Sequence, residues 1–407
     1  MAALSDPHPR PVRTPPHILT LVALVSVSTL AMNLFLPSLP SMTAWFDTTD
    51  NVMQLAVGLY LGVNAVLQLG IGPISDRYGR RPVVLAGLLI FMVATLGCLW
   101  APDVTTFLVF RMIQAAVVTT LVLSRAVVRD LYPQDKAASM LGYVTMGMSI
   151  VPMLGPMLGG MLEASFGWKS NFWLLLAAAG AVFLWAWHDM GETATPSTGS
   201  MRDQVRQYPL LLRSGRFWGY CAASAFASGA FFAYLGGAPF VGDHVFGMDP
   251  ATLGFFFGAP AFGYLVGNGI SGRYSSQYGI DRMITAGACG QLLGLSALAA
   301  LTMAGFTSHW VFFGFMTFIG LGNGLVVPNA TAGMLSVRPE LAGTASGLGG
   351  AIMLAGGAAL SVLAGWLLHQ WEGALPLVLL MVASGLGAVA SILLTRHAHR
   401  RQAALQA

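Results

Sequence analysis

The sequence predicts an all-α polytopic membrane protein with about twelve transmembrane helices in two pseudo-symmetric six-helix bundles. Charged residues make up only 9% of the 407 residues, the hydrophobic class reaches 56%, and the mean hydropathy is +0.69. The apolar residues gather in stretches of about 20, the length at which an α-helix crosses a bilayer. An internal sequence repeat further predicts that these helices divide into two bundles.

Twelve apolar stretches follow one another along the chain. They lie near residues 18–37, 52–71, 83–100, 106–128, 138–160, 171–188, 217–240, 252–271, 283–304, 310–333, 343–368 and 374–395. The first is too long for a signal peptide and lacks a small-residue cleavage site, so we expect it to remain as a helix. Each stretch is therefore predicted to be one membrane span.

Basic residues in alternate connections predict the orientation, because short loops rich in Lys and Arg stay in the cytoplasm. One side carries Arg10, Arg13, Arg77, Arg80, Arg81, Arg129, Lys136, Arg202, Arg206, Arg213, Arg216, Arg273, Arg282, Arg338, Arg396, Arg400 and Arg401. The other side carries only Lys169. Both termini are therefore expected in the cytoplasm. The net charge of +4 reflects this topology and gives no reason to invoke nucleic acid.

A polar stretch divides the spans six and six. It predicts an N-terminal domain over residues 1–188, a cytoplasmic linker over 189–216 and a C-terminal domain over 217–407 with a short basic tail. Residues 272–279 match residues 72–79 at four of eight positions, 200 residues later. Two halves related in this way are expected to hold a substrate site at their interface near the middle of the membrane.

The segment Gly72–Pro82 places four charges in eleven residues between two apolar stretches. Because lipid does not tolerate such charges within a span, we expect a tight, water-facing connection punctuated by glycine and proline. A charged hinge between paired spans is typical of a transporter that changes conformation.

Six short motifs are similar to those of the major facilitator superfamily and, within it, of the Bcr/CflA group of drug/proton antiporters. The superfamily signatures are Gly72–Pro82, Arg111-Met112-Ile113-Gln114, and Gly147 with Gly155-Pro156-Met157-Leu158-Gly159-Gly160; the group motifs are Leu36–Pro40, Arg129-Asp130-Leu131-Tyr132-Pro133 and Ala342-Gly343-Thr344-Ala345-Ser346. The resemblance runs through nearly the whole chain. It implies a monomeric transporter of the bacterial inner membrane, without a cofactor, that exports small amphiphilic drug-like compounds by alternating access and couples export to proton entry.

The resemblance implies a conformational latch at the basic side. Asp76 would face the N-terminus of span eleven and help to hold the outward-open state. The other expected latch residues are Gly72, Arg77, Gly79, Arg80, Arg81, Arg125, Arg129 and Asp130. Alternatively, the charges merely enforce the positive-inside topology. Gly147, Gly155, Pro156, Gly159 and Gly160 are expected to bend span five where it meets the C-terminal half, or to form an ordinary packing kink.

Arg111 lies inside span four, where an arginine is costly and is by default functional or paired. All sixteen acids fall in predicted loops or span ends, so its partners must be neutral groups such as Asn33, Gln114 or backbone carbonyls, or water or substrate. We expect a role in the cavity, with an internal brace as the alternative. At Asn33 the sequence departs from many relatives, which carry an acid there. An amide cannot titrate, so proton coupling through this position is excluded.

Further candidates for the substrate cavity are polar or aromatic residues inside the spans. They are Tyr60, Asn64 and Gln68, spaced by four on span two; Phe231, Phe232 and Tyr234 on span seven; and Asn268, Asn323 and Asn329 in the second half. For each aromatic residue, ordinary helix packing is the alternative. The span interiors hold the fixed cation Arg111 and no acid. We therefore expect the cavity to accept neutral, zwitterionic or anionic substrates rather than lipophilic cations.

Other classes of function remain as alternatives. A facilitator or a metabolite importer would have the same fold. An integral membrane enzyme would need a titratable constellation, yet the eight histidines show no metal spacing with acids and no nucleophile motif stands out, so we expect neither a catalytic nor a metal site. Cys98, Cys221 and Cys289 are expected to be packing residues. A sensor would usually add a soluble domain, and the longest polar segment has only about thirty residues.

Overall fold

The computed structural model describes residues 16–131, 151–152, 154–193, 209–338 and 342–406. Its helices are α1 (Ile18–Asn33), η1 (Leu36–Ser38), α2 (Leu39–Trp45), α3 (Asp50–Tyr78), α4 (Arg80–Leu99), α5 (Val104–Ile113), η2 (Gln114–Val117), α6 (Val118–Leu131), α8 (Lys169–Asp189), α10 (Gly215–Phe240), η3 (Val241–Val245), α11 (Pro250–Phe256), α12 (Ala259–Tyr278), α13 (Ile280–Met303), α14 (His309–Phe315), α15 (Thr317–Val337), α16 (Ala342–Gln370) and α17 (Leu375–Gln406). Residues 154–166 are also helical.

Within these ranges, eleven helical segments are long and apolar enough to cross a membrane. The other predicted span, residues 138–160, lies largely outside the described residues. The described helices confirm the predicted all-α membrane fold. Some spans consist of two consecutive helices: α1 and α2 together form one span, and so do α11 and α12.

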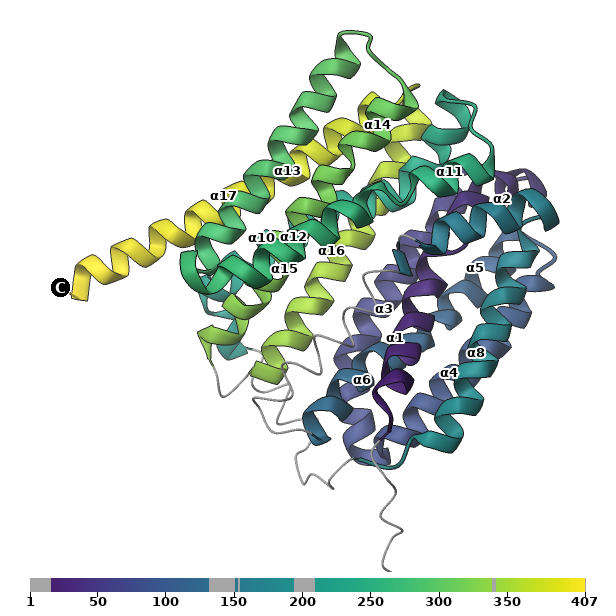
Figure 1. Ribbon diagram of the computed structural model, residues 1–407, viewed down its shortest axis with the longest axis horizontal. Helices are drawn as coiled ribbons and strands as arrows, with labels where there is room; N and C mark the ends of the chain where they lie inside the picture. Colours follow the sequence, from purple (N-terminus) through teal and green to yellow (C-terminus); the bar gives the residue numbers. More distant parts are fainter. Residues whose placement is uncertain (1–15, 132–150, 153, 194–208, 339–341, 407) are drawn as a thin grey trace, which may run out of the picture.

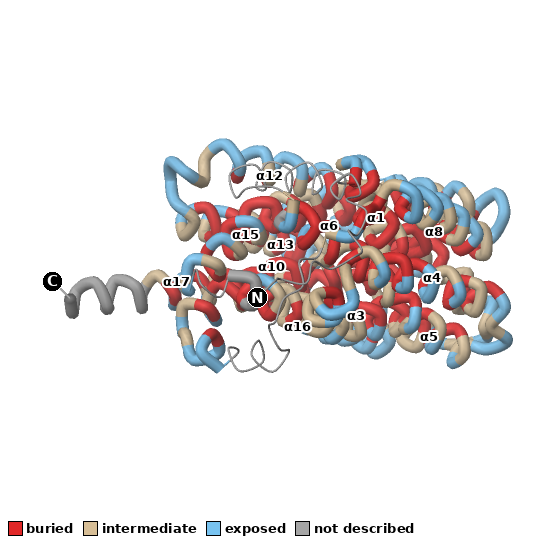
Figure 2. Tube along the Cα trace, turned by 90° about the horizontal axis from the view of Figure 1, so that it is seen from below, coloured by how far each residue is buried: buried red, intermediate tan, exposed pale blue. Residues whose placement is uncertain are grey.

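The helices form two bundles (Figure 1). Helices α1 to α8 make one bundle, in purple to teal, and α10 to α17 make the other, in green to yellow. Buried residues line the interior of both bundles and the face between them (Figure 2). Many exposed side chains are large and apolar, for example Leu293, Phe262 and Leu394, as expected for a surface in contact with lipid.

The two bundles meet along α3 and α16, which run antiparallel. Neighbouring positions along this seam are Gln54 with Gly365, Gly58 with Val362, Gly62 with Ala358, and Gln68 with Gly350. As the residue numbers rise on α3 they fall on α16. Glycine at four of these positions lets the two helices approach closely, as small residues do between membrane helices.

In the described part of the chain, the contacts between the bundles other than this seam gather at one end of the molecule. At this closed end, α11 lies against η1, and a Cβ atom at Gly160 would overlap the carbonyl oxygen of Pro250. His244 Nδ1 lies 3.2 Å from the Asp50 carboxylate across the two bundles. At the opposite, basic end, where Gly79 joins α3 to α4, the bundles diverge (Figure 1), and a Cβ atom at Gly72 or Gly347 would meet nothing within 4 Å.

The predicted connection over Gly72–Pro82 is much shorter than expected. Helix α3 continues through Tyr78 with Pro73 inside it, and only Gly79 separates α3 from α4. The predicted tight connection is therefore present, but it is confined to Gly79, and the rest of the segment belongs to the two helices. The turn is made by Gly79, whose φ of 98° favours glycine, and the Glu192 carboxylate accepts the backbone N–H of Arg80 at 2.8 Å and thereby caps α4.

Candidate functional site

Arg111 is a fully buried cation in the N-terminal bundle, with 1% of its surface exposed. Its guanidinium donates to Gln114 Oε1 at 2.8 Å, to the carbonyl of Ala31 at 2.9 Å and to the carbonyl of Ala56 at 3.3 Å. Gln114 in turn donates to Thr95 Oγ1 at 2.8 Å. The direct partners come from η2, α1 and α3, and Gln114 extends the network to α4, so Arg111 ties α5 to the rest of its bundle.

Two aromatic rings enclose the same guanidinium. Its central carbon lies 4.0 Å from the ring centre of Tyr60 and 4.2 Å from that of Phe35. Cation–π contacts of this kind are strongest where water is absent. Asn33 is not a partner of Arg111, because its amide donates to the Thr29 carbonyl at 2.8 Å. In this conformation Arg111 is an internal brace.

The polar row on span two is divided between two environments. Tyr60 faces Arg111, and Asn64 donates to the Tyr60 carbonyl at 3.0 Å inside the N-terminal bundle. Gln68 is half-buried and lies beside Gly350 of α16. Of the three, Gln68 is therefore the one at the interface between the bundles.

The aromatic residues of span seven lie mostly in the C-terminal core. The Tyr234 ring is fully buried, 4.8 Å from the ring of Phe257, and Phe231 stacks on Tyr234 at 6.5 Å. Phe232 instead packs against α16, where its ring lies so close to Gly357 that a Cβ atom added at this glycine would overlap it. Phe231 is only partly buried.

The three asparagines of the second half have different surroundings. Asn329 donates to Ser271 Oγ at 2.8 Å and thereby joins α15 to α12. Asn323 is 5% exposed, and its side-chain oxygen has no hydrogen-bond partner among the described residues. Asn268 is half-buried beside Gly324. The predicted cavity residues therefore do not converge on one cluster in this conformation.

The predicted latch centres on Arg80, which is buried. Its guanidinium lies 2.5 Å from the Asp76 carboxylate and 3.0 Å from that of Asp130, and it also bonds to Ser75 Oγ. Asp76 thus pairs within its own bundle here. The Arg80 guanidinium stays charged between these two carboxylates, because arginine does not deprotonate in proteins.

The other basic residues of the latch contact aromatic rings or the opposite bundle. Arg77 lies over the Tyr78 ring, and Arg81 donates to the Trp187 carbonyl at 2.8 Å. Arg125 is exposed and lies near enough to Tyr264 of α12 for an electrostatic interaction between the bundles. The side chain of Arg129 lies outside the described residues.

The glycines of span five are contact points. A Cβ atom at Gly155 would touch Leu30 and Asn33 of α1, and one at Gly159 would overlap the Leu34 carbonyl. Gly160 faces Pro250 of the other bundle in the same way. The prediction that this segment meets the C-terminal half therefore agrees with its position. Gly147 lies outside the described residues.

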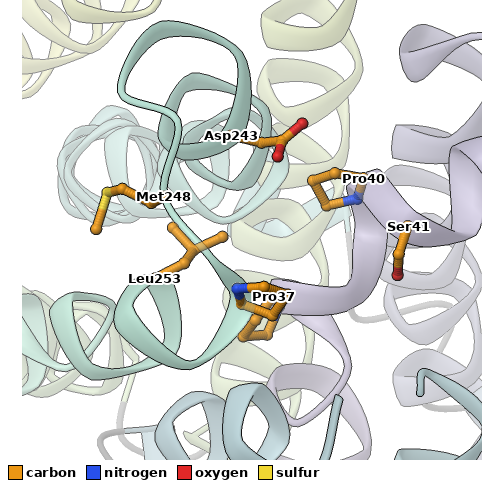
Figure 3. Close-up of a pocket in the computed structure, with 7 residues that line it drawn as sticks. Pro37, Pro40, Ser41, Asp243, Met248 and Leu253 are labelled. Carbon is orange, nitrogen blue, oxygen red and sulfur yellow. The ribbon is translucent and has the colours of Figure 1, made fainter. Parts of the chain in front are cut away.

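A cavity of about 260 Å³ lies at the closed end between the two bundles (Figure 3). Its lining residues are Pro37, Pro40, Ser41, Asp243, Met248, Pro250 and Leu253. Asp249 caps α11 beside the cavity; hydrogen bonds from the Thr252 hydroxyl and backbone N–H groups lower the pKa of the Asp249 carboxyl.

Sequence reasoning missed Glu163, which lies three residues beyond the predicted end of span five. The side chain is buried, its Oε1 accepts from Ser41 Oγ at 2.6 Å, and its Oε2 has no hydrogen-bond partner among the described residues. No group of three metal-ligating side chains occurs in the described part of the chain. One sequence signal could have identified Glu163: it follows Gly159 and Gly160 within about one helical turn, so it shares their surroundings.

Comparisons with known proteins fit this architecture. The sequence matches the family profile of the Major Facilitator Superfamily over residues 21–361 and again over 244–407. It is 28% identical to "Multidrug resistance protein D" of Escherichia coli K12, covering 95% of this chain and 97% of the relative. It is 27% identical to the "Bicyclomycin resistance protein homolog" of Haemophilus influenzae, covering 84% and 86%.

The fold resembles solved transporter structures. A D-xylose–proton symporter superposes with a TM-score of 0.73 at 16% identity, covering 93% of this chain and 96% of the symporter. A bacterial homologue of the human lysosomal transporter Spinster, in an inward-facing and occupied conformation, gives a TM-score of 0.70 at 18% identity, covering 94% and 96%. The family profile spans most of the chain, which is thus a multi-pass membrane transporter rather than an enzyme and belongs to the major facilitator superfamily.

Proposed function

We propose that this transporter exports small amphiphilic, drug-like compounds across the bacterial inner membrane by alternating access, as a monomer and coupled to proton entry. The observation that carries the proposal is that, among the described residues, the two helical bundles meet at one end and diverge at the other, in a chain whose relatives are named for multidrug and bicyclomycin resistance. The basic end is cytoplasmic by the positive-inside rule, as are both termini. The described conformation is then open to the cytoplasm.

The seam between α3 and α16 supports a rocking motion. Its antiparallel register, from Gln54 with Gly365 to Gln68 with Gly350, would bring Asp76 opposite residues 343–344 if it continued to the basic end. These residues form the first turn of α16, where a carboxylate is favoured by the helix dipole. Asp76 would leave Arg80, its partner here, to face α16 when the basic end closes.

The charges of the described spans support a preference for neutral, zwitterionic or anionic compounds. Arg111 is enclosed and has neutral partners, whereas Arg125 is exposed and lies within electrostatic range of Tyr264 of the other bundle. A cation exposed in the space between the bundles repels lipophilic cations at low dielectric constant. Arg125 therefore adds to the sequence argument, which rested on Arg111.

Proton coupling needs a titratable group whose surroundings change with conformation, and Asn33 cannot supply it. Glu163 is a buried carboxyl beside Gly160, on the helix that must leave Pro250 when the closed end opens. Opening would bring water to its unpartnered oxygen, and a change of solvation is one of the factors that alters proton affinity. We assign the coupling role to Glu163 on these grounds.

The test is export from an efflux-deficient bacterial host, with and without a protonophore. We expect export of neutral chloramphenicol that the protonophore abolishes, and little export of the cation ethidium. Glu163→Gln should lose the dependence on the proton gradient, whereas the control Asp103→Asn, at an exposed helix cap, should keep it. Export unaffected by the protonophore would instead indicate a facilitator, net uptake an importer, and robust ethidium export would contradict the charge argument.

A further inference from the structure

Gln54 is the least expected residue in the closed seam. It belongs to α3, is 1% exposed, and neither its amide oxygen nor its amide nitrogen has a hydrogen-bond partner among the described residues. It lies against Gly365 of α16, where a Cβ atom would overlap the Gln54 amide oxygen. A glutamine is thus enclosed between the two bundles with both of its polar ends unsatisfied.

Ser361 lies on the same face of α16, one helical turn before Gly365. It is fully buried, its hydroxyl also lacks a partner in the described part of the chain, and Gly236 of α10 lies against it. Two polar side chains without partners therefore occur about one turn apart, where α3, α10 and α16 meet. The contact between Asp50 and His244 marks the same end of the molecule.

A permanent seal would be better served by apolar side chains, because a buried polar group without a partner costs the closed state free energy. That cost is recovered when the closed end opens and the groups meet water or substrate. A glutamine amide and a serine hydroxyl each offer a donor and an acceptor, so they suit amide, hydroxyl and nitro groups of a neutral amphiphile. Neither offers a charge.

We propose that Gln54 and Ser361 form a release subsite, which binds the hydrogen-bonding groups of the exported compound when the closed end opens. The subsite rests on the proposed export function. It is distinct from Arg111 and its neutral partners, which lie inside the N-terminal bundle. Its unpaired groups also bias the molecule toward reopening once the substrate has left.

The experiment measures the accessibility of a cysteine at the subsite from outside the cell. Ser361→Cys is made in a chain whose Cys98, Cys221 and Cys289 are replaced by alanine, and intact cells are treated with a membrane-impermeant maleimide. We expect labelling that chloramphenicol slows at least five-fold. The control Thr307→Cys, on the exposed connection between α13 and α14, should be labelled at a rate that chloramphenicol does not change.

A second variant tests the unsatisfied amide. Gln54→Leu removes it from the closed seam and should slow the labelling of Ser361→Cys by about five- to 150-fold, the range that corresponds to one unsatisfied buried group. Gln291→Leu is the matched control: Gln291 is equally buried, its Nε2 donates to the Ala227 carbonyl at 3.0 Å, and its Oε1 has no partner among the described residues. It lies inside one bundle, so its loss does not favour the closed seam over the open one. It should change the labelling rate less than two-fold.

Three results would overturn the subsite. One is absence of labelling at Ser361→Cys in cells that export chloramphenicol, and another is labelling that chloramphenicol does not slow in the same cells. The third is an equal effect of Gln54→Leu and Gln291→Leu. Absence of chloramphenicol export by the unmodified protein would instead overturn the proposed function, and the subsite with it.

Discussion

At the scale of the residue, Arg111 shows how a membrane protein accommodates a cation without a carboxylate. Its charge is spread over two carbonyls, one amide and two aromatic rings. We predict that Arg111→Met lowers the free energy of unfolding by about 2–4 kcal/mol, because Gln114 and both rings lose their partner. Thermal unfolding in detergent measures this change.

Arg111→Lys should recover part of the lost stability. An ammonium keeps the charge, but it cannot stack between two rings while donating in several directions. If both variants unfolded like the unmodified protein yet lost drug binding, Arg111 would be a cavity residue and the brace would be wrong.

At the scale of the element, the helix over residues 154–166 joins the bundles through atoms that have little freedom to move. Gly160 faces the backbone carbonyl of Pro250, and Gly254 of α11 faces that of Pro156. We predict that Gly160→Ala weakens the closed end by about 1–3 kcal/mol, because its methyl group would overlap backbone that no side-chain rotation can displace. Spin labels at Thr49 and Thr307 should report a larger population with the closed end open.

Gly290→Ala is the control for this prediction. Gly290 lies in α13, and a Cβ atom there would meet nothing within 4 Å. An alanine should leave the distance distribution unchanged. Equal distributions for Gly160→Ala and Gly290→Ala would show that the backbone contact does not limit opening.

At the scale of the whole molecule, the predicted latch depends on two conformations. Asp76 pairs with Arg80 in the described one, and the proposed one places it opposite the first turn of α16. We predict that Asp76→Asn keeps the protein folded but disfavours closure of the basic end by about 1–3 kcal/mol, with slower transport. Accessibility labelling from both sides of the membrane measures the shift.

Asp130→Asn separates the latch from the local ion pair. It removes the other carboxylate of Arg80 but has no place in the proposed contact with α16. It should therefore shift the conformational balance less than Asp76→Asn does. Unchanged accessibility and transport in Asp76→Asn would leave membrane topology as the role of Asp76.

The sequence by itself determined the membrane class, the division of apolar stretches, the family motifs and the neutral surroundings of Arg111. Hydropathy, charge spacing and glycine-rich motifs are properties of short segments, so they can be read without knowing which helices are neighbours. The same local reasoning predicted a tight connection within Gly72–Pro82 but not that only Gly79 forms it. The continuation of α3 to Tyr78 depends on Gly79 and on Glu192, more than a hundred residues away.

Only the tertiary structure decided which polar groups are enclosed together. It buried Arg80 between two carboxylates and placed Glu163 against Ser41, and it left Gln54 and Ser361 in the seam without partners among the described residues. None of these neighbours follows from spacing along one helix, because each depends on the face that a second helix presents. The energetic consequence of a polar side chain in a membrane protein is set by that second face.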